Sequence, residues 1–165
     1  MNTSALTRRG ATAVLGSAPL AVALCLAAPQ AAAADTACPA PGFAANSFSA
    51  PGAECSASSV GGSAAAAYGL GGSATANAGQ TSLSLAIAQN GGTANSTSTT
   101  LSGPAAIAIG PGAVVNMAGV RPGLSIGIAG PGAQVTVTGV SVPTCGGGFG
   151  FAGDFQTLQG CVSLR

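Results

Sequence analysis

The chain has 165 residues, of which only 4% are charged, and its formal net charge is +1 at pH 7. It contains no histidine, lysine or tryptophan, and after Ala34 its charged side chains are Asp35, Glu54, Arg121, Asp154 and Arg165. Two arginines cannot form a basic surface for nucleic acid. The missing imidazoles exclude histidine-dependent catalysis and histidine metal sites, so we expect no metal or cofactor.

The N-terminal segment has the features of an export signal. Arg8 and Arg9 precede an apolar stretch from Gly10 to Ala28, and residues 31–34 are all alanine. We therefore predict a signal peptide over residues 1–34, cleaved before Asp35, with the twin-arginine route left open as the less favoured form of export. The apolar stretch is shorter than the roughly 20 residues that span a bilayer and is interrupted by Pro19, so retention as a membrane anchor is the less favoured alternative. After cleavage we expect no membrane-spanning segment. The alanine-rich style of the signal resembles actinobacterial signals.

The rest of the chain is predicted to be all-β. Turn-forming Pro-Gly and Gly-Gly pairs recur at intervals of about ten residues, as at Gly71-Gly72, Gly91-Gly92 and Pro111-Gly112. Between the later pairs, Leu, Ile and Val alternate with small or hydroxyl residues, which is the period of a β-strand. We expect the aliphatic side chains to fill the interior and the Ser and Thr side chains to form a polar outer face. The predicted strands are Thr81–Ala88, Ala105–Ile109, Val114–Ala118, Leu124–Ala129 and Gln134–Thr138.

A twenty-residue repeat favours a short β-solenoid or β-roll. Residues 110–120 match residues 130–140 closely, and a period of about 20 residues is typical of one solenoid coil. In a solenoid, Val115 and Val135 would pair in parallel. The alternative is an antiparallel meander or sandwich, because Asn90-Gly91 is a strong hairpin signal. Disorder of the Ser/Thr-rich stretch Asn95–Thr100 is a further alternative.

Four cysteines remain after the predicted signal, and in an exported chain they indicate two disulfides. We favour Cys38–Cys55 and Cys145–Cys161, each closing a segment that contains phenylalanine. The alternative pairing, Cys38 with Cys161 and Cys55 with Cys145, would tie the two ends together. The predicted organisation is an N-terminal cap at 35–56, a repetitive Gly/Ala-rich body at 57–143 and a C-terminal cap at 144–165.

Two resemblances concern the residues already described. Residues 106–113 and 85–88 resemble fragments of the head repeats of trimeric autotransporter adhesins, which implies a β-roll. The whole layout, an alanine-ended signal followed by a small Ala/Gly-rich domain with four cysteines, is similar to secreted actinobacterial proteins of unknown function.

The sequence favours a binding or structural role over catalysis. We expect a secreted, non-catalytic protein of the extracellular space or cell envelope, with an envelope component as its partner. The alternative is a carrier of a small apolar ligand or lipid, with Phe149, Phe151 and Phe155 as candidate binding residues. A hydrolase that uses the carboxylate of Asp154 is a third and weaker hypothesis, because no second carboxylate lies near it in the sequence.

Overall fold

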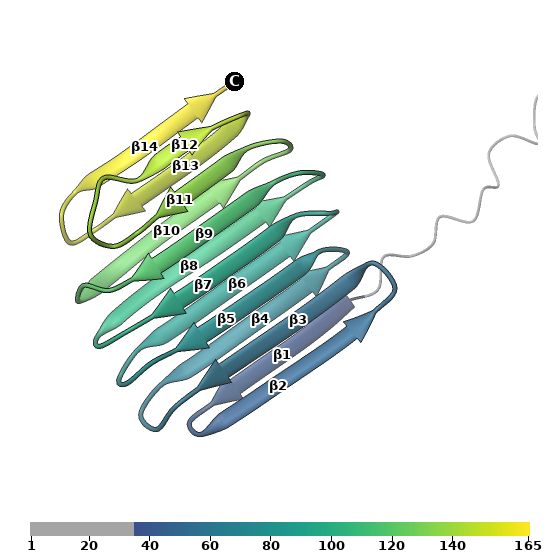
Figure 1. The fold of residues 1–165 in the computed structure, drawn as a ribbon, viewed down its shortest axis with the longest axis vertical. Helices are drawn as coiled ribbons and strands as arrows, with labels where there is room; N and C mark the ends of the chain where they lie inside the picture. Colours follow the sequence, from purple (N-terminus) through teal and green to yellow (C-terminus); the bar gives the residue numbers. More distant parts are fainter. Residues whose placement is uncertain (1–34) are drawn as a thin grey trace, which may run out of the picture. The chain divides into compact units, whose positions relative to one another are not determined.

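The computed structural model describes residues 35–165, and the predicted signal peptide at 1–34 lies outside the described residues. Residues 35–165 form fourteen β-strands (Figure 1). Among these residues there is no helix long and apolar enough to cross a membrane. The strands are β1 Asp35–Pro41, β2 Ala44–Ala50, β3 Ala53–Ser59, β4 Ala64–Leu70, β5 Ser73–Ala78, β6 Leu83–Gln89, β7 Thr93–Ser98, β8 Ser102–Ile109, β9 Val114–Gly119, β10 Gly123–Ala129, β11 Gln134–Val137, β12 Thr144–Gly146, β13 Phe149–Asp154 and β14 Gln159–Leu164.

The strands build two seven-stranded sheets. Sheet A has the order β1-β4-β6-β8-β10-β13-β14, and sheet B has the order β12-β11-β9-β7-β5-β3-β2. From β3 to β11 the chain alternates between the sheets, and successive strands within a sheet pair in parallel, as Val115 does with Val135. This is the predicted all-β solenoid, with about four turns. The antiparallel meander is wrong, because β6 and β7, on either side of Asn90-Gly91, lie in different sheets.

The predicted strands are present, and the structure adds others. The five predicted strands correspond to β6, β8, β9, β10 and β11. The Ser/Thr-rich stretch for which disorder was an alternative lies mostly in β7, Thr93–Ser98. The alanine-rich strands β4 and β5 and the strands near both ends lack a clear aliphatic alternation, and pairing with their neighbours defines them.

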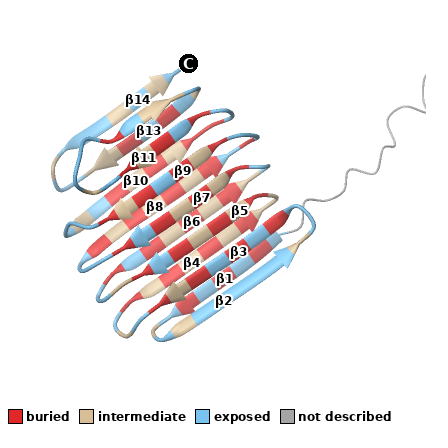
Figure 2. Ribbon diagram, in the orientation of Figure 1, coloured by how far each residue is buried: buried red, intermediate tan, exposed pale blue. Residues whose placement is uncertain are grey.

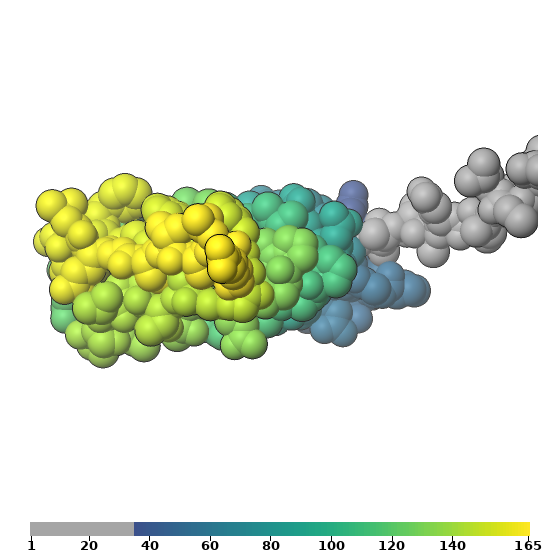
Figure 3. All heavy atoms as spheres, turned by 90° about the horizontal axis from the view of Figure 1, so that it is seen from above, coloured from purple at the N-terminus to yellow at the C-terminus, as the bar shows by residue number. Residues whose placement is uncertain are grey.

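Antiparallel strands and disulfides close the two ends of the coil stack. At the N-terminal end, β1 pairs antiparallel with β4 and β2 pairs antiparallel with β3. At the other end, β12 pairs with β11 and β13 with β10, again antiparallel. Figure 3 looks onto this C-terminal end, where the last strands cover the coil beneath. The favoured disulfides, Cys38–Cys55 and Cys145–Cys161, are both present, and each joins sheet A to sheet B.

The two sheets lie close together. The Ser84 hydroxyl in sheet A donates a hydrogen bond of 2.9 Å to the backbone carbonyl of Ser96 in sheet B, so one serine side chain spans the gap. The disulfides join Cα atoms of opposite sheets at 5.8 and 5.7 Å. Sheets in ordinary sandwiches pack about 10 Å apart. Most of this interior therefore has room only for glycine, alanine, serine and similarly small side chains.

This close spacing reverses the expected orientation of sheet A. In β6, Ser84, Ala86 and Ala88 are buried, whereas Leu85 and Ile87 point outward. The strands β4, β8 and β10 repeat the pattern, and Figure 2 shows the resulting stripes of buried residues. The expectation that the aliphatic residues of these strands fill the interior is wrong, because the sheets approach too closely to admit them.

Sheet B buries larger side chains where sheet A supplies glycine. Val115 and Val135 are fully buried, and Met117 is nearly so. A Cβ placed on Gly127 of β10 would lie 3.0 Å from Cγ1 of Val115 and 2.6 Å from Sδ of Met117. Gly127 thus provides the space that the larger residues occupy. In β11 the expected orientation is correct, with valines inward and Thr136 outward.

Serine hydroxyls satisfy the polar part of the interior. Ser82 and Ser98 share a hydrogen bond of 2.8 Å, and the Ser84 hydroxyl, which bonds to the Ser96 carbonyl, also lies 2.8 Å from the Ser96 hydroxyl. Within residues 35–165 every buried side-chain nitrogen or oxygen has a hydrogen-bond partner. Each such bond contributes about 0.5–1.5 kcal/mol net, and leaving one partner unsatisfied costs more.

Each turn that leads from a strand of sheet A to the next strand of sheet B contains a glycine, and these turns lie above one another in successive coils. Gly71, Gly91, Gly112 and Gly132 all have φ between 70° and 82°. This left-handed conformation is favourable for glycine and costs other residues about 1 kcal/mol or more. The predicted turn pairs in this part of the chain therefore do mark the corners of the coils.

We predict that Gly92→Ala lowers the free energy of unfolding by about 1–3 kcal/mol. A Cβ at Gly92 would lie 2.6 Å from the carbonyl oxygen of Ala108, which is fixed in the sheet A ladder. The matched control is Gly146→Ala, where a Cβ would meet nothing within 4 Å, and its effect should stay within about 0.5 kcal/mol. Urea denaturation of the oxidised protein measures both. Equal effects would contradict the close approach at this corner.

A second prediction concerns the interior of sheet A. Ala106 is 0% exposed, whereas Ala118 points outward from β9 in sheet B. We expect Ala106→Leu to cost about 3 kcal/mol or more because the sheets would have to separate. Ala118→Leu should change stability by less than about 1 kcal/mol. Thermal denaturation followed by circular dichroism compares the two, and a well-tolerated leucine at position 106 would show that the interior is roomy.

Candidate functional site

Within residues 35–165, the outer side of sheet A carries most of the leucine and isoleucine side chains. We call this surface the apolar face and define it by the outward residues of β4, β6, β8, β10 and β13. Its larger members are Tyr68, Leu70, Leu83, Leu85, Ile87, Ile107, Ile109, Leu124, Ile126, Ile128, Phe149 and Phe151. Leu83 and Leu124 are 60% and 61% exposed, so the fold itself leaves much of this apolar area in water.

The sheet register arranges the apolar face in straight rows. Tyr68 pairs with Ile87, Ile87 with Ile107, and Ile107 with Ile128. The row continues through Phe151 to Val162. Neighbouring strands lie about 4.8 Å apart, so adjacent side chains in the row contact and partly shield one another. The result is a continuous apolar ridge across six strands.

Beside this ridge the surface rises and falls from strand to strand. Leu83 and Leu85 of β6 stand next to Gly103 and Ala105 of β8, and the hollow above Gly103 is flanked on its other side by Leu124. A Cβ on Gly103 would lie 2.6 Å from Cδ2 of Leu124, which shows that the leucine leans over the glycine. The apolar face is therefore uneven: large side chains project from some strands, and small residues leave hollows on the strands between them. We call this pattern the relief of the apolar face.

The three predicted binding phenylalanines lie at one end of this relief. Phe149 and Phe151 point outward from β13 and are 54% and 37% exposed, and Phe155 in the following turn is 65% exposed. Phe149 pairs with Leu164, and Phe151 pairs with Val162 and with Ile128. Phe149 and Phe151 thus extend the apolar face, while Phe155 lies in the turn before β14.

The outer side of sheet B has the opposite chemistry, and we call it the polar face. One of its rows runs Ser56, Thr75, Asn95, Asn116, Thr136. Two neighbours in this row bond to each other, since the Asn95 amide donates to Oδ1 of Asn116 at 3.0 Å. Polar side chains that bond to each other on an exposed surface are also common on sheet faces that contact only water. The polar face is therefore the weaker candidate for binding.

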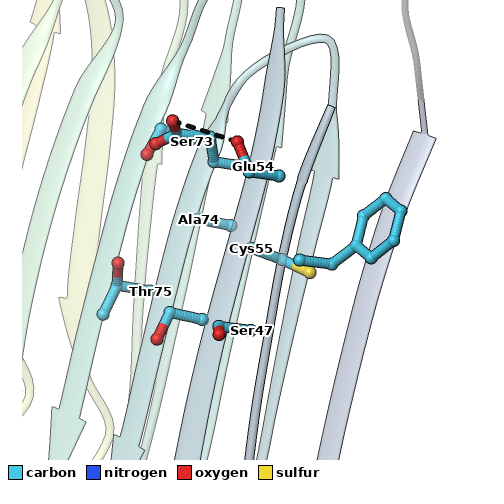
Figure 4. Close-up of a pocket in the computed structure, with 9 residues that line it drawn as sticks. Ser47, Glu54, Cys55, Ser73, Ala74 and Thr75 are labelled. Carbon is cyan, nitrogen blue, oxygen red and sulfur yellow. Dashed lines mark hydrogen bonds between the residues drawn. The ribbon is translucent and has the colours of Figure 1, made fainter. Parts of the chain in front are cut away.

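A shallow depression on the polar face contains its one carboxylate. Glu54 lies near the start of β3 with Ser73 of β5 beside it, and Thr75 lies two residues further along β5, level with Ser56 (Figure 4). The Ser49 hydroxyl donates to Oε1 of Glu54 at 3.5 Å, a long contact on an exposed group. One carboxylate among hydroxyls supplies no second acid or base for hydrolysis.

Asp154 has a local structural role. Its two carboxylate oxygens accept hydrogen bonds from the Gln156 backbone N–H at 2.9 Å and from the Thr157 hydroxyl at 3.0 Å. These bonds shape the turn between β13 and β14. Among residues 35–165 no three histidine, cysteine, aspartate or glutamate side chains gather as metal ligands would.

Sequence reasoning missed the apolar face because it assigned those residues to the interior. A signal was present in the repeat. The column of inward residues Ala67, Ala86, Ala106, Gly127 stays small in every coil, whereas the neighbouring column stays large. A position that is small in each repeat indicates a tightly spaced interior.

The comparison with protein families covers almost the whole chain. Residues 2–164 match the family described as "Family of unknown function (DUF6764)". No curated protein and no solved structure gives a significant match. The match spans the predicted signal, both disulfide-linked ends and all of the strands, and the chain belongs to this family of unknown function.

Proposed function

We propose that this protein is a secreted, non-catalytic structural or binding protein that acts in the extracellular space or cell envelope. We further propose that it associates with its partner through the apolar face. The observation that carries this proposal is the outward orientation of the Leu, Ile and Phe side chains of sheet A.

The energetics of that orientation support an association surface. Fully burying one Leu, Ile or Phe side chain contributes about 1.5–3 kcal/mol relative to leaving it exposed. The fold forgoes most of this gain at Leu83 and Leu124, which are largely exposed, and part of it at half-buried residues such as Ile107. Soluble monomers seldom expose continuous apolar patches larger than a few hundred Å², and larger patches mark interaction surfaces. A partner that covers the apolar face would recover the stabilisation that folding alone leaves unused.

The disulfides support a location outside the cytoplasm. Both join the sheets near the ends of the solenoid, and such bonds are typical of extracellular proteins because the cytoplasm keeps thiols reduced. The predicted signal at residues 1–34 is consistent with this location. The local hydrogen bonds of Asp154 and the isolation of Glu54 on sheet B favour a non-catalytic role.

The carrier alternative has less support. A carrier encloses most of its ligand in a pocket, whereas Phe149 and Phe151 lie on an outer sheet face. The interior between the sheets is filled by small side chains such as Ala86 and Ala106, which are fully buried. The hollow at Gly103 is an open surface depression.

Site-specific photocrosslinking tests the proposed surface. A benzoylphenylalanine replaces either Ile107 on the apolar face or Thr97 on the polar face, and both variants are expressed in the native host and irradiated. We expect a covalent adduct from position 107 and none from position 97, because only the first is covered by a partner. Adducts from position 97 alone, or from neither position, would contradict the proposal. An adduct at position 107 with lipid alone would favour the carrier.

A further inference from the structure

We infer that the partner on the apolar face is a second copy of this chain, packed face to face about a two-fold axis parallel to the strands. This inference rests on the proposed function, since it names the occupant of the same surface. The axis would pass between β6 and β8, so that two A sheets form a sandwich and the polar faces point outward on both sides.

The relief of the apolar face carries this inference. In two adjacent rows, large and small residues alternate from one strand to the next. β4 presents Ala64 and Ala66, β6 presents Leu83 and Leu85, β8 presents Gly103 and Ala105, and β10 presents Leu124 and Ile126. In these two rows the projecting strands are thus β6 and β10, and the hollow strands are β4 and β8.

A two-fold axis between β6 and β8 brings projections over hollows. Rotation about an axis parallel to the strands keeps each residue at its level along the strand and reverses the order of the strands. The β6 strand of one copy then lies over β8 of the other, and β10 lies over β4. Leu85 meets Ala105, Ile126 meets Ala66, and Leu83 meets the hollow that remains at Gly103 beside the leaning Leu124 side chain. The same surface thus supplies both partners, as a two-fold interface requires.

The match extends toward both ends of the sheet. The same operation places β1 over β13, so that Pro39 faces Gly153 and Ala37 faces Phe151. In the ridge, Ile87 of one copy lies over Ile107 of the other at the centre of the interface, where aliphatic contacts exclude water best. In the two adjacent rows a large residue therefore faces a small one, whereas in the ridge large residues meet, Ile87 over Ile107 at the axis and Tyr68 over Ile128 beside it.

Area and charge are also suitable. Six overlapping strands about 4.8 Å apart, each about seven residues long, cover about 650 Å² per copy. A standard protein interface buries about 800 Å² per partner, and about 1,000 Å² in total is the lower limit for a specific one. Asp35, at the corner of β1, is the one charged side chain that the strands of sheet A turn outward within residues 35–165, so no buried like charges oppose association.

Sedimentation equilibrium tests this dimer. The protein is expressed from its full sequence, so that residues 1–34 can direct export, and it is purified with both disulfides formed. It should sediment at twice the mass of the purified monomer over a range of concentrations. Ala105→Leu should raise the dimer dissociation constant about tenfold or more, because the new leucine would meet Leu85 of the other copy. Leu85→Ala should weaken the dimer by leaving a cavity.

The decisive variant combines both changes. Leu85→Ala with Ala105→Leu exchanges projection and hollow, and it should restore the dissociation constant to within about threefold of the wild type. Ala118→Leu on the polar face is the control and should leave association unchanged. Circular dichroism of each variant verifies the fold, which these outward positions should not disturb.

Several outcomes would overturn the dimer. The first is a wild-type chain that stays monomeric at all concentrations. The second is a double variant whose dimer is weakened by as much as the effects of the two single substitutions added together. The third is a monomeric wild type that floats with phosphatidylcholine vesicles. If the wild type is monomeric but still crosslinks from position 107 to another molecule, the dimer fails and the proposed function remains. Crosslinks from position 97 alone would reject both.

Discussion

The close approach of the two sheets is the constraint on which the rest of this structure depends. A serine hydroxyl of one sheet reaches a backbone carbonyl of the other, as Ser84 does at Ser96. Two disulfides hold the sheets equally close near both ends. With so little depth between them, the sheets meet mostly through alanine, serine and glycine, and a larger residue such as Val115 fits only opposite a glycine. Stability therefore has to come largely from many backbone ladders, satisfied hydroxyls and small contacts.

The same constraint produces the two-faced surface. Large side chains that the interior cannot accept must point outward, and the chain places them almost entirely on sheet A. Sheet B instead turns Ser, Thr and Asn outward. An ordinary sandwich hides its aliphatic faces inside one chain. Here the aliphatic face lies on the outside, so the hydrophobic effect is available for association.

Much of the architecture could be predicted from the sequence. The twenty-residue repeat indicated parallel coils, and the spacing of Cys38, Cys55, Cys145 and Cys161 indicated two local disulfides. Alternation with period two defines two faces of a strand, but it does not say which one is buried. The usual rule assigns aliphatic residues to the interior, and it fails for β6, β8 and β10 because the depth of the interior is set by the facing sheet.

The candidate site could be predicted only in part. Phe149 and Phe151 do belong to the apolar face, but its centre, around Ile87 and Ile107, was assigned to the core. Its relief depends on which strands are neighbours in the sheet. Leu85 and Ala105 are twenty residues apart in the chain and become adjacent only through the parallel register. The alternation of large and small residues across the strands therefore cannot be recognised in the linear sequence.

Nuclear Overhauser effects in the methyl-labelled protein test the thin interior most directly. Gly127 faces Val115 and Val135 across the gap, since a Cβ on it would lie 3.0 and 3.3 Å from their Cγ1 atoms. Cross-peaks should therefore connect the methyl groups of Val115 and Val135 to the α-protons of Gly127, and none should reach the methyl groups of Ile126 or Ile128. Strong cross-peaks between these valines and isoleucines would place the aliphatic residues inside and contradict the close packing of the two sheets.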